Sequence, residues 1–133
     1  VVHKYFRVKK NREDTAILGS SLGGLVSLYA GVQYSQIFGA VAALSPSLWW
    51  NSRSLFDVYR KASRHPLKIY LDSGTAGGEK PQDVLQFKRE FSDLYPNPNS
   101  LVTVIQNGAT HSESYWAQRL PGALLFLFPY NQR

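Results

Sequence analysis

The sequence predicts an α/β fold in which a mainly parallel sheet is flanked by helices. Short apolar runs of strand length occupy residues 15–18, 40–44, 67–71 and 101–105, and segments of helical period lie between and after them. This alternation is typical of βαβ units, in which successive strands run parallel. The 133 residues are 44% hydrophobic and 14% aromatic, enough to build one buried core. We therefore expect residues 1–133 to form a single domain.

Each helix is predicted from apolar residues that recur three or four positions apart. In residues 22–34 such spacing joins Leu25, Leu28, Tyr29 and Val32 on one face. Residues 52–63 and 82–94 show the same period. The last segment, residues 113–128, is apolar and predicted to be helical, with Pro121 expected to force a break or a fresh start.

The small number of predicted strands indicates that further strands or a partner complete the sheet. Four parallel strands are few for a sheet that must be covered on both faces, and no hairpin protects the first edge. We expect the chain to be the C-terminal half of a larger fold that lacks its N-terminal strands here. A missing N-terminal half or an oligomeric partner would then cover the sheet edge.

Composition excludes several classes of function. The chain has no cysteine, which excludes disulfides, thiolate metal sites and a cysteine nucleophile. The cellular compartment stays open, with the cytoplasm as our default expectation. No metal-ligand spacing and no phosphate-binding loop is present, so we expect no metal and no cofactor.

Neither nucleic acid nor membrane is an expected partner. The formal charge is +6, but the basic residues are scattered, and their one tight group, Lys9, Lys10 and Arg12, is followed directly by Glu13 and Asp14. The longest apolar run, residues 123–128, is far shorter than the roughly 18 residues of a membrane span.

The junction after the first strand predicts a nucleophile. Gly19 and Gly23 flank Ser21 in the stretch GSSLGG, which gives the GxSxG pattern of a nucleophile elbow. A strand that turns at once into a helix needs small residues two before and two after its apex, and Gly24 would let the helix pack closely on the strand. We expect the Ser21 hydroxyl at the C-terminal edge of the sheet, with the backbone N–H of Leu22 aimed at the oxyanion of a tetrahedral intermediate.

Chain order identifies the candidate base. A serine hydroxyl needs an adjacent imidazole to take its proton, and in this fold class the order is serine, acid, histidine. His3 precedes Ser21, and His65 is expected at the opposite end of the third strand. His111 follows the fourth strand, so its loop leaves the same edge as Ser21. Only His111 both follows Ser21 in the chain and is expected at the same edge of the sheet.

The acid is expected in the loop after the third strand, which carries three carboxylates. We rank Glu79 first, because the glycine-rich loop around it lets its carboxylate reach across. Asp72 at the strand's end is second, since it could instead accept backbone N–H bonds. Asp83 is third, because it suits the N-terminal turn of the next helix. A Ser–His dyad without an acid is the remaining alternative.

Two adjacent tryptophans follow the second strand, where a loop would border the serine. Either Trp49 or Trp50 could stack on an aromatic acyl group or a sugar ring. Two adjacent tryptophans cannot easily both face a substrate, so either one of them lines the site or, as the alternative, at least one packs in the core.

Four motifs in these segments carry a resemblance to a known family. They are TAILGSSLGGL around Ser21, LSPSLWW at residues 44–50, YLDSG at residues 70–74 and GATHSESYWAQRL at residues 108–120. In this order they resemble the esterase D and enterochelin-esterase-like group of the α/β-hydrolase superfamily, which includes siderophore esterases, feruloyl esterases and S-formylglutathione hydrolase. The resemblance implies an α/β-hydrolase-type fold, Ser21 as nucleophile and His111 as base, with Glu79 the best match for the acid. It also implies an upstream half that supplies further strands and a second oxyanion N–H.

The leading functional hypothesis is therefore hydrolysis of a small carboxylic ester through an acyl-enzyme. One alternative is a binding module that keeps the fold without the chemistry. Another is an acyltransferase that uses the same site with a different acceptor.

Overall fold

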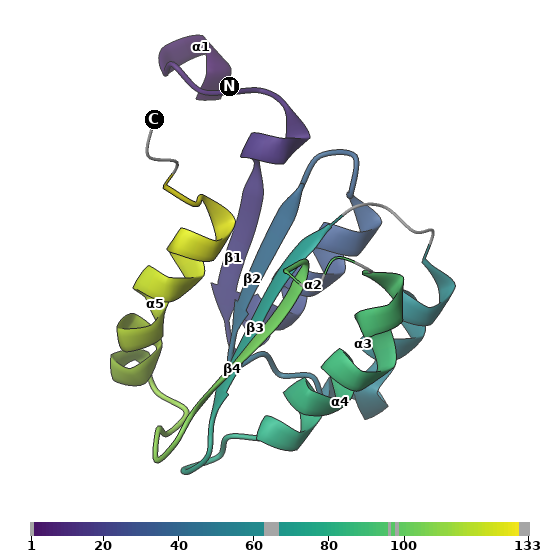
Figure 1. Ribbon diagram of the computed structural model, residues 1–133, viewed down its shortest axis with the longest axis vertical. Helices are drawn as coiled ribbons and strands as arrows, with labels where there is room; N and C mark the ends of the chain where they lie inside the picture. The colour runs from purple at the N-terminus through teal and green to yellow at the C-terminus, as the bar shows by residue number, and fades with distance from the viewer. Residues whose placement is uncertain (1, 63–66, 96, 98, 131–133) are drawn as a thin grey trace.

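The structure of the protein is a computed structural model, which describes residues 2–62, 67–95, 97 and 99–130 (Figure 1). Its centre is a parallel sheet of four strands in the order β1-β2-β3-β4. The strands are β1 (Ala16–Ser20), β2 (Ala40–Leu44), β3 (Lys68–Gly74) and β4 (Leu101–Gln106). The register aligns Ser20 with Leu44, Leu44 with Asp72, and Asp72 with Val104. The four C-terminal strand ends therefore lie side by side, which confirms the predicted parallel sheet.

Helices cover both faces of this sheet. Figure 1 shows α2 (Leu22–Gln33), α3 (Trp50–Lys61) and α4 (Pro81–Phe91) on one side and α5 (Glu113–Leu127) on the other. The remaining elements are short: α1 (Val2–Tyr5), η1 (Arg12–Asp14) and η2 (Ser92–Leu94). The architecture is the predicted α/β arrangement of four strand–helix repeats.

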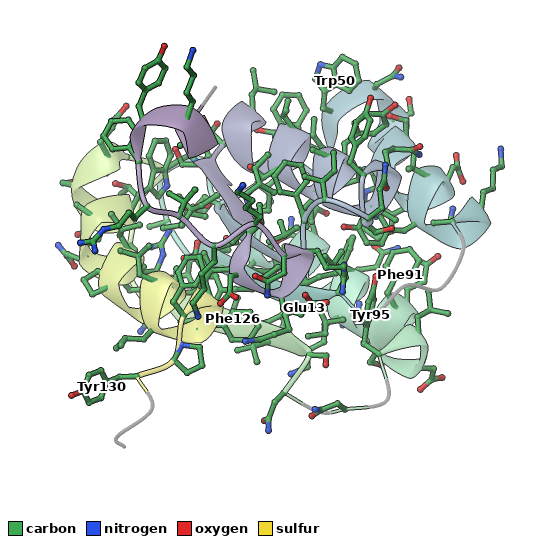
Figure 2. All side chains as sticks on the ribbon, turned by 90° about the horizontal axis from the view of Figure 1, so that it is seen from above. Glu13, Trp50, Phe91, Tyr95, Phe126 and Tyr130 are labelled. Carbon is green, nitrogen blue, oxygen red and sulfur yellow. The ribbon has the colours of Figure 1, made fainter. Side chains whose placement is uncertain are left out.

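Two buried clusters follow the alternation of side chains along the strands. Odd-numbered strand residues such as Val41 and Ile69 pack against α2, α3 and α4, whereas even-numbered ones such as Ala42 and Tyr70 pack against α5. The view from above in Figure 2 places Phe91 and Tyr95 on the first side and Phe126 on the second. All five residues of β2 are buried, as expected for a strand covered on both faces.

Several element ends differ from the prediction. Strands β1 and β3 continue to Ser20 and Gly74, because pairing with β2 and β4 holds polar residues that lie beyond the apolar runs. Helix α5 runs through Pro121 without a break, which corrects the predicted interruption. Its buried residues on both sides of the proline, Arg119 and Leu127, keep it packed along the sheet.

Helix α3 begins with a left-handed turn that local patterns did not indicate. Asn51, Ser52 and Arg53 all have positive φ values, 46°, 52° and 62°. A regular helix therefore starts only after Arg53. The predicted position of His65 lies outside the described residues.

Within those described residues, none of the helices combines the length and apolar character needed to cross a membrane. The same residues contain no group of three or more histidine, aspartate or glutamate side chains that could hold a metal ion.

Candidate active site

Ser21 occupies the bend between β1 and α2. Its backbone has φ 55° and ψ −121°, a conformation that non-glycine residues rarely adopt and that costs of order 1–3 kcal/mol. Its N–H donates to the Leu44 carbonyl at 2.9 Å, which fixes the bend to the end of β2. The strained turn leaves the hydroxyl projecting from the C-terminal edge of the sheet.

The two glycines of the motif have different roles. A Cβ at Gly19 would lie 2.4 Å from the Gly23 carbonyl oxygen, so only glycine allows the helix to approach the strand here. A Cβ at Gly23 would meet no described atom within 4 Å. The requirement for a small residue on both sides of Ser21 is therefore wrong for Gly23. Gly24 approaches the Gly19 carbonyl and Pro46 closely, with a built Cβ 3.2 Å from each.

His111 reaches Ser21 from the loop after β4. Its Nε2 lies 2.8 Å from Ser21 Oγ, within hydrogen-bond distance. The loop is held by the His111 N–H, which donates to the Gly77 carbonyl at 3.2 Å. Trp116 of α5 sets its ring against the imidazole at 5.0 Å between centroids and 86° between planes. Both the backbone and the ring are therefore supported in the orientation that faces the hydroxyl.

Glu79 lies behind the imidazole, on the side opposite Ser21. Its Oε2 is 3.5 Å from His111 Nδ1, at the outer limit of a hydrogen bond, and its side chain is 2% exposed. Ser45 Oγ donates to Oε1 at 2.6 Å and Ser73 Oγ donates to Oε2 at 3.2 Å. Serine, imidazole and carboxylate thus form one continuous row.

The other two candidate acids point elsewhere. Asp72 is fully buried and forms an ion pair with Arg119, whose Nε is 2.9 Å from Asp72 Oδ2. Asp83 forms an ion pair with Arg53. The structure therefore brings Glu79, and neither aspartate, to His111.

The first turn of α2 offers donors beside the hydroxyl. Leu22 is the first helical residue, and N–H groups in a first turn have no intrahelical acceptor. The positive end of the helix dipole lies at the same place, which favours an anion there. Ser47 Oγ lies 3.4 Å from Ser21 Oγ, so a second hydroxyl adjoins that of Ser21.

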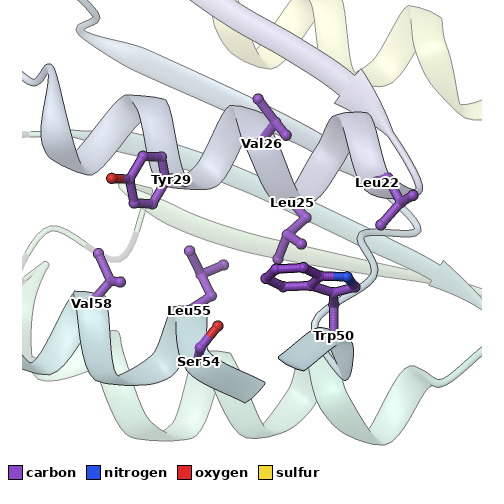
Figure 3. Close-up of a pocket in the computed structure, with 8 residues that line it drawn as sticks. All are labelled: Leu22, Leu25, Val26, Tyr29, Trp50, Ser54, Leu55 and Val58. Atoms are coloured by element: carbon purple, nitrogen blue, oxygen red, sulfur yellow. The ribbon is translucent and has the colours of Figure 1, made fainter. Parts of the chain in front are cut away.

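The two tryptophans diverge, and neither is buried. Trp49 is 49% exposed and borders a small cavity that is also lined by Glu79 and His111, with Lys80 Nζ 5.4 Å from its ring centre. Trp50 is 48% exposed and lines an apolar groove of about 410 Å³ between α2 and α3. Figure 3 shows its indole beneath Leu25. The alternative in which at least one tryptophan packs in the core is wrong, because both sit where α3 starts at the molecular surface.

Three polar residues that contact Glu79 were not predicted from the sequence. They are Ser45, Ser73 and Arg119. One signal was available, since Arg119 falls four and eight positions before Ala123 and Leu127, on the buried face of α5. The two serines carried no such signal, because a serine at a strand end is ordinary.

Burial changes the ionisation of two groups in this network. Burial raises the pKa of Asp72, against the opposing effects of Arg119, the Ser45 N–H and Tyr70. The pKa of the Tyr70 phenol is also raised, first by burial and then by the Asp72 carboxylate to which it donates at 3.2 Å.

Comparison with known proteins identifies the family. A family model described as "Putative esterase" matches residues 1–127. The chain belongs to this esterase family. Among curated proteins, this esterase-family chain is similar to the Iron(III) enterobactin esterase of Escherichia coli O6:H1, with 46% identity over 124 residues covering 87% of the chain and 30% of that protein. It is also similar to the Uncharacterized protein YbbA of Bacillus subtilis, with 22% identity covering 99% of the chain and 56% of that protein.

Solved structures show the same fold. The enterochelin esterase of Shigella flexneri superposes with a TM-score of 0.80 and 24% identity, covering 96% of this chain and 34% of that one. The S-formylglutathione hydrolase FrmB of Staphylococcus aureus gives a TM-score of 0.69 and 22% identity, covering 95% and 55% of the two chains. The esterase-family chain therefore has the predicted α/β-hydrolase-type fold, and it spans about half or less of the length of these relatives.

Proposed function

We propose that this protein is a serine hydrolase that cleaves carboxylic esters through an acyl-enzyme. Ser21 is the nucleophile, His111 the general base and acid, and Glu79 the carboxylate that orients the imidazole. The observation that carries the proposal is the 2.8 Å separation of Ser21 Oγ and His111 Nε2. That distance is within the range needed for direct proton transfer.

The proposed reaction has two halves. Ser21 Oγ attacks the ester carbonyl carbon while His111 Nε2 takes its proton, and the Leu22 N–H stabilises the oxyanion. The tetrahedral intermediate collapses as the C–O bond to the alcohol breaks, and the imidazolium gives its proton to the departing oxygen. Water then attacks the acyl-enzyme, losing a proton to the same imidazole, and Ser21 leaves with that proton. Glu79 stays ionised and stabilises the imidazolium in both halves.

The names of relatives suggest the substrate class. They include enterobactin esterases and a ferulic acid esterase as well as S-formylglutathione hydrolase, and one enterobactin esterase structure was obtained with 2,3-di-hydroxy-N-benzoyl-serine. We propose a siderophore-, feruloyl- or S-formylglutathione-type ester as the substrate. The half-exposed Trp49 beside His111 favours a substrate with an aromatic ring, because such a ring can stack on an indole face.

Labelling with a fluorophosphonate tests the nucleophile. The reagent phosphonylates an activated serine, so mass spectrometry of the folded full-length protein is expected to place the adduct on Ser21. Ser21→Ala removes the nucleophile and should abolish the label, while Ser47→Ala, 3.4 Å away, should retain it. A folded wild-type protein without label would contradict the proposal and favour a binding module.

Turnover tests the reaction class. Hydrolysis of nitrophenyl butyrate should fall about a thousandfold or more in Ser21→Ala and in His111→Ala, because the two groups act as a unit. The expected products are butyrate and nitrophenol. If added glycerol diverts most of the acyl group into glyceryl ester, the enzyme is an acyltransferase instead of a hydrolase.

A further inference from the structure

A buried cation from α5 lies next to the proposed acid. Arg119 is 7% exposed, and it is the only lysine or arginine in α5. Its Nη2 donates to Ser45 Oγ at 2.8 Å and lies 3.7 Å from Glu79 Oε1. Its Nη1 donates to Gln106 Oε1 at 2.8 Å. A buried arginine with these partners is fixed in position, because its planar fork leaves little freedom once both ends are held.

Ser45 links this cation to the carboxylate. Its hydroxyl accepts from Arg119 and donates to Glu79 Oε1 at 2.6 Å. Its backbone has φ 44°, and its N–H donates to Asp72 Oδ1 at 2.8 Å. Asp72 thus anchors both the serine and the guanidinium. A row of contacts runs from Arg119 through Ser45 to Glu79 and on to His111.

We infer that Arg119 is a positioning residue for the proposed active site, holding Glu79 aimed at His111 through Ser45. The inference rests on the proposed function and goes beyond it, because Arg119 contacts Ser45 and Asp72 and has no described contact with Ser21. Its effect on the reaction is exerted entirely through the carboxylate.

The positive charge of Arg119 acts on the proposed site in one direction. The working site needs an ionised Glu79 and a neutral His111, and a cation nearby opposes protonation of both. The groups in contact with Glu79 are Ser45, Ser73, His111 and Arg119, and Lys80 lines the same small cavity as Glu79 and His111. The groups facing Arg119 from the sheet are Asp72, which Tyr70 also contacts, and Gln106. Removing the guanidinium takes away the cation beside Glu79 and leaves Asp72 without its ion-pair partner, while Lys80 stays in place, so protonation of the site becomes easier.

The pH profile of kcat/KM tests the inference in the full-length protein, with nitrophenyl acetate as substrate. In Arg119→Gln the acid limb should move up by roughly one pH unit, which lowers kcat/KM roughly tenfold on the acid side of the profile. In Arg119→Lys the charge is kept and the planar guanidinium is lost, so kcat should fall while the acid limb stays near that of the wild type.

Arg53→Gln is the matched control, because it removes another arginine–carboxylate pair that does not contact Glu79. Its profile should match that of the wild type.

Each outcome decides one question. A uniform drop of Arg119→Gln at every pH, or an equal displacement in Arg53→Gln, would overturn the positioning role and leave a structural one. If Arg119→Gln does not fold, Ser45→Ala replaces it and should move the acid limb in the same direction by a smaller amount; an unmoved limb again overturns the inference. A wild-type protein with neither turnover nor fluorophosphonate label instead contradicts the proposed function itself.

Discussion

At the scale of single residues, the bend at Ser21 depends on one close approach. The carbonyl oxygen of Gly23 in α2 lies only 2.4 Å from the place that a Cβ at position 19 would occupy. Ser21 holds an unfavourable φ of 55° because this contact and its hydrogen bond to Leu44 fix the chain on both sides. The strained backbone conformation is therefore the one in which the Ser21 hydroxyl faces His111.

This asymmetry between the two glycines can be tested. Gly19→Ala should lower the free energy of unfolding by about 2 kcal/mol, because the helix must move away from the strand. It should also reduce ester hydrolysis about a hundredfold, since a displacement of about 1 Å at the nucleophile is costly. Gly23→Ala is the matched control and should stabilise the protein by up to about 1 kcal/mol through helix propensity. Urea unfolding and nitrophenyl ester turnover measure both effects, and equal losses in the two variants would contradict the different roles.

The residues differ in how well the sequence predicted them. Ser21 and His111 were indicated by a motif and by chain order, and Glu79 by a flexible loop at a strand end. Ser45 and Arg119 were not, since their importance comes from contacts between segments 74 residues apart. Asp72 could have been placed facing α5, because it is two residues from Tyr70 on the same strand. Its partner on that helix could not be identified without the packing of α5.

At the scale of elements, the apolar runs predicted every strand of the described sheet but not where the strands end. Pairing extends β3 to Gly74, three residues past its apolar run, and this extension brings Ser73 to Glu79. Pro121 was expected to interrupt α5, yet the helix continues because its packing on the sheet outweighs one missing hydrogen bond. Local pattern therefore gives the type of each element, and tertiary contacts set its limits.

Helix α2 packs on β2 at a second glycine. A Cβ at Gly31 would lie 2.1 Å from Cγ2 of Val41, which is fully buried and stiff at χ1. Gly31→Ala should therefore destabilise the protein by about 1–3 kcal/mol despite its higher helix propensity. Val41→Ala removes the obstructing methyl, so the double variant should lose at least about 1 kcal/mol less than the sum of the two single losses.

Gly122→Ala in α5 is the control for this pair. A Cβ there meets no described atom within 4 Å, so the same substitution should stabilise by about 1 kcal/mol. Chemical denaturation of the wild type, Gly31→Ala, Val41→Ala and the double variant measures the four free energies of the cycle. Additive losses for Gly31 and Val41 would show that the helix does not approach the strand at this point.

At the scale of the whole molecule, the site joins the two faces of the sheet. Ser21, the proposed nucleophile, directly precedes α2 on one face, whereas Arg119, which lies beside the proposed acid Glu79, comes from α5 on the other (Figure 1). The parallel strands make this possible because all their C-terminal ends meet at one edge. Asp72 connects the two faces, because it contacts both the Ser45 N–H and Arg119 of α5. Since this carboxylate is fully buried, the stability of the protein depends on whether Asp72 is ionised.

The sign of that linkage follows from the raised pKa of Asp72. Because burial favours the neutral carboxyl in the folded protein, the folded state holds this proton more tightly than the unfolded state, whose ordinary value is 3.8. The contribution of Asp72 to stability is therefore fully present below that value and is lost as the pH rises through the folded-state pKa.

Asp72→Asn isolates this effect, because the amide does not titrate. Its Oδ1 can still accept the Ser45 N–H, while the opposed amide and guanidinium cost free energy at every pH. The difference in free energy of unfolding, wild type minus Asp72→Asn, should therefore decrease as the pH rises from the ordinary carboxyl range toward neutrality, measured by urea unfolding at a series of pH values. Arg119 Nε lies 2.9 Å from the carboxylate, but burial of the carboxylate has the larger effect on its pKa and outweighs this ion pair. A difference that grows with pH would show that the guanidinium wins and that the carboxylate is the favoured form in the folded protein.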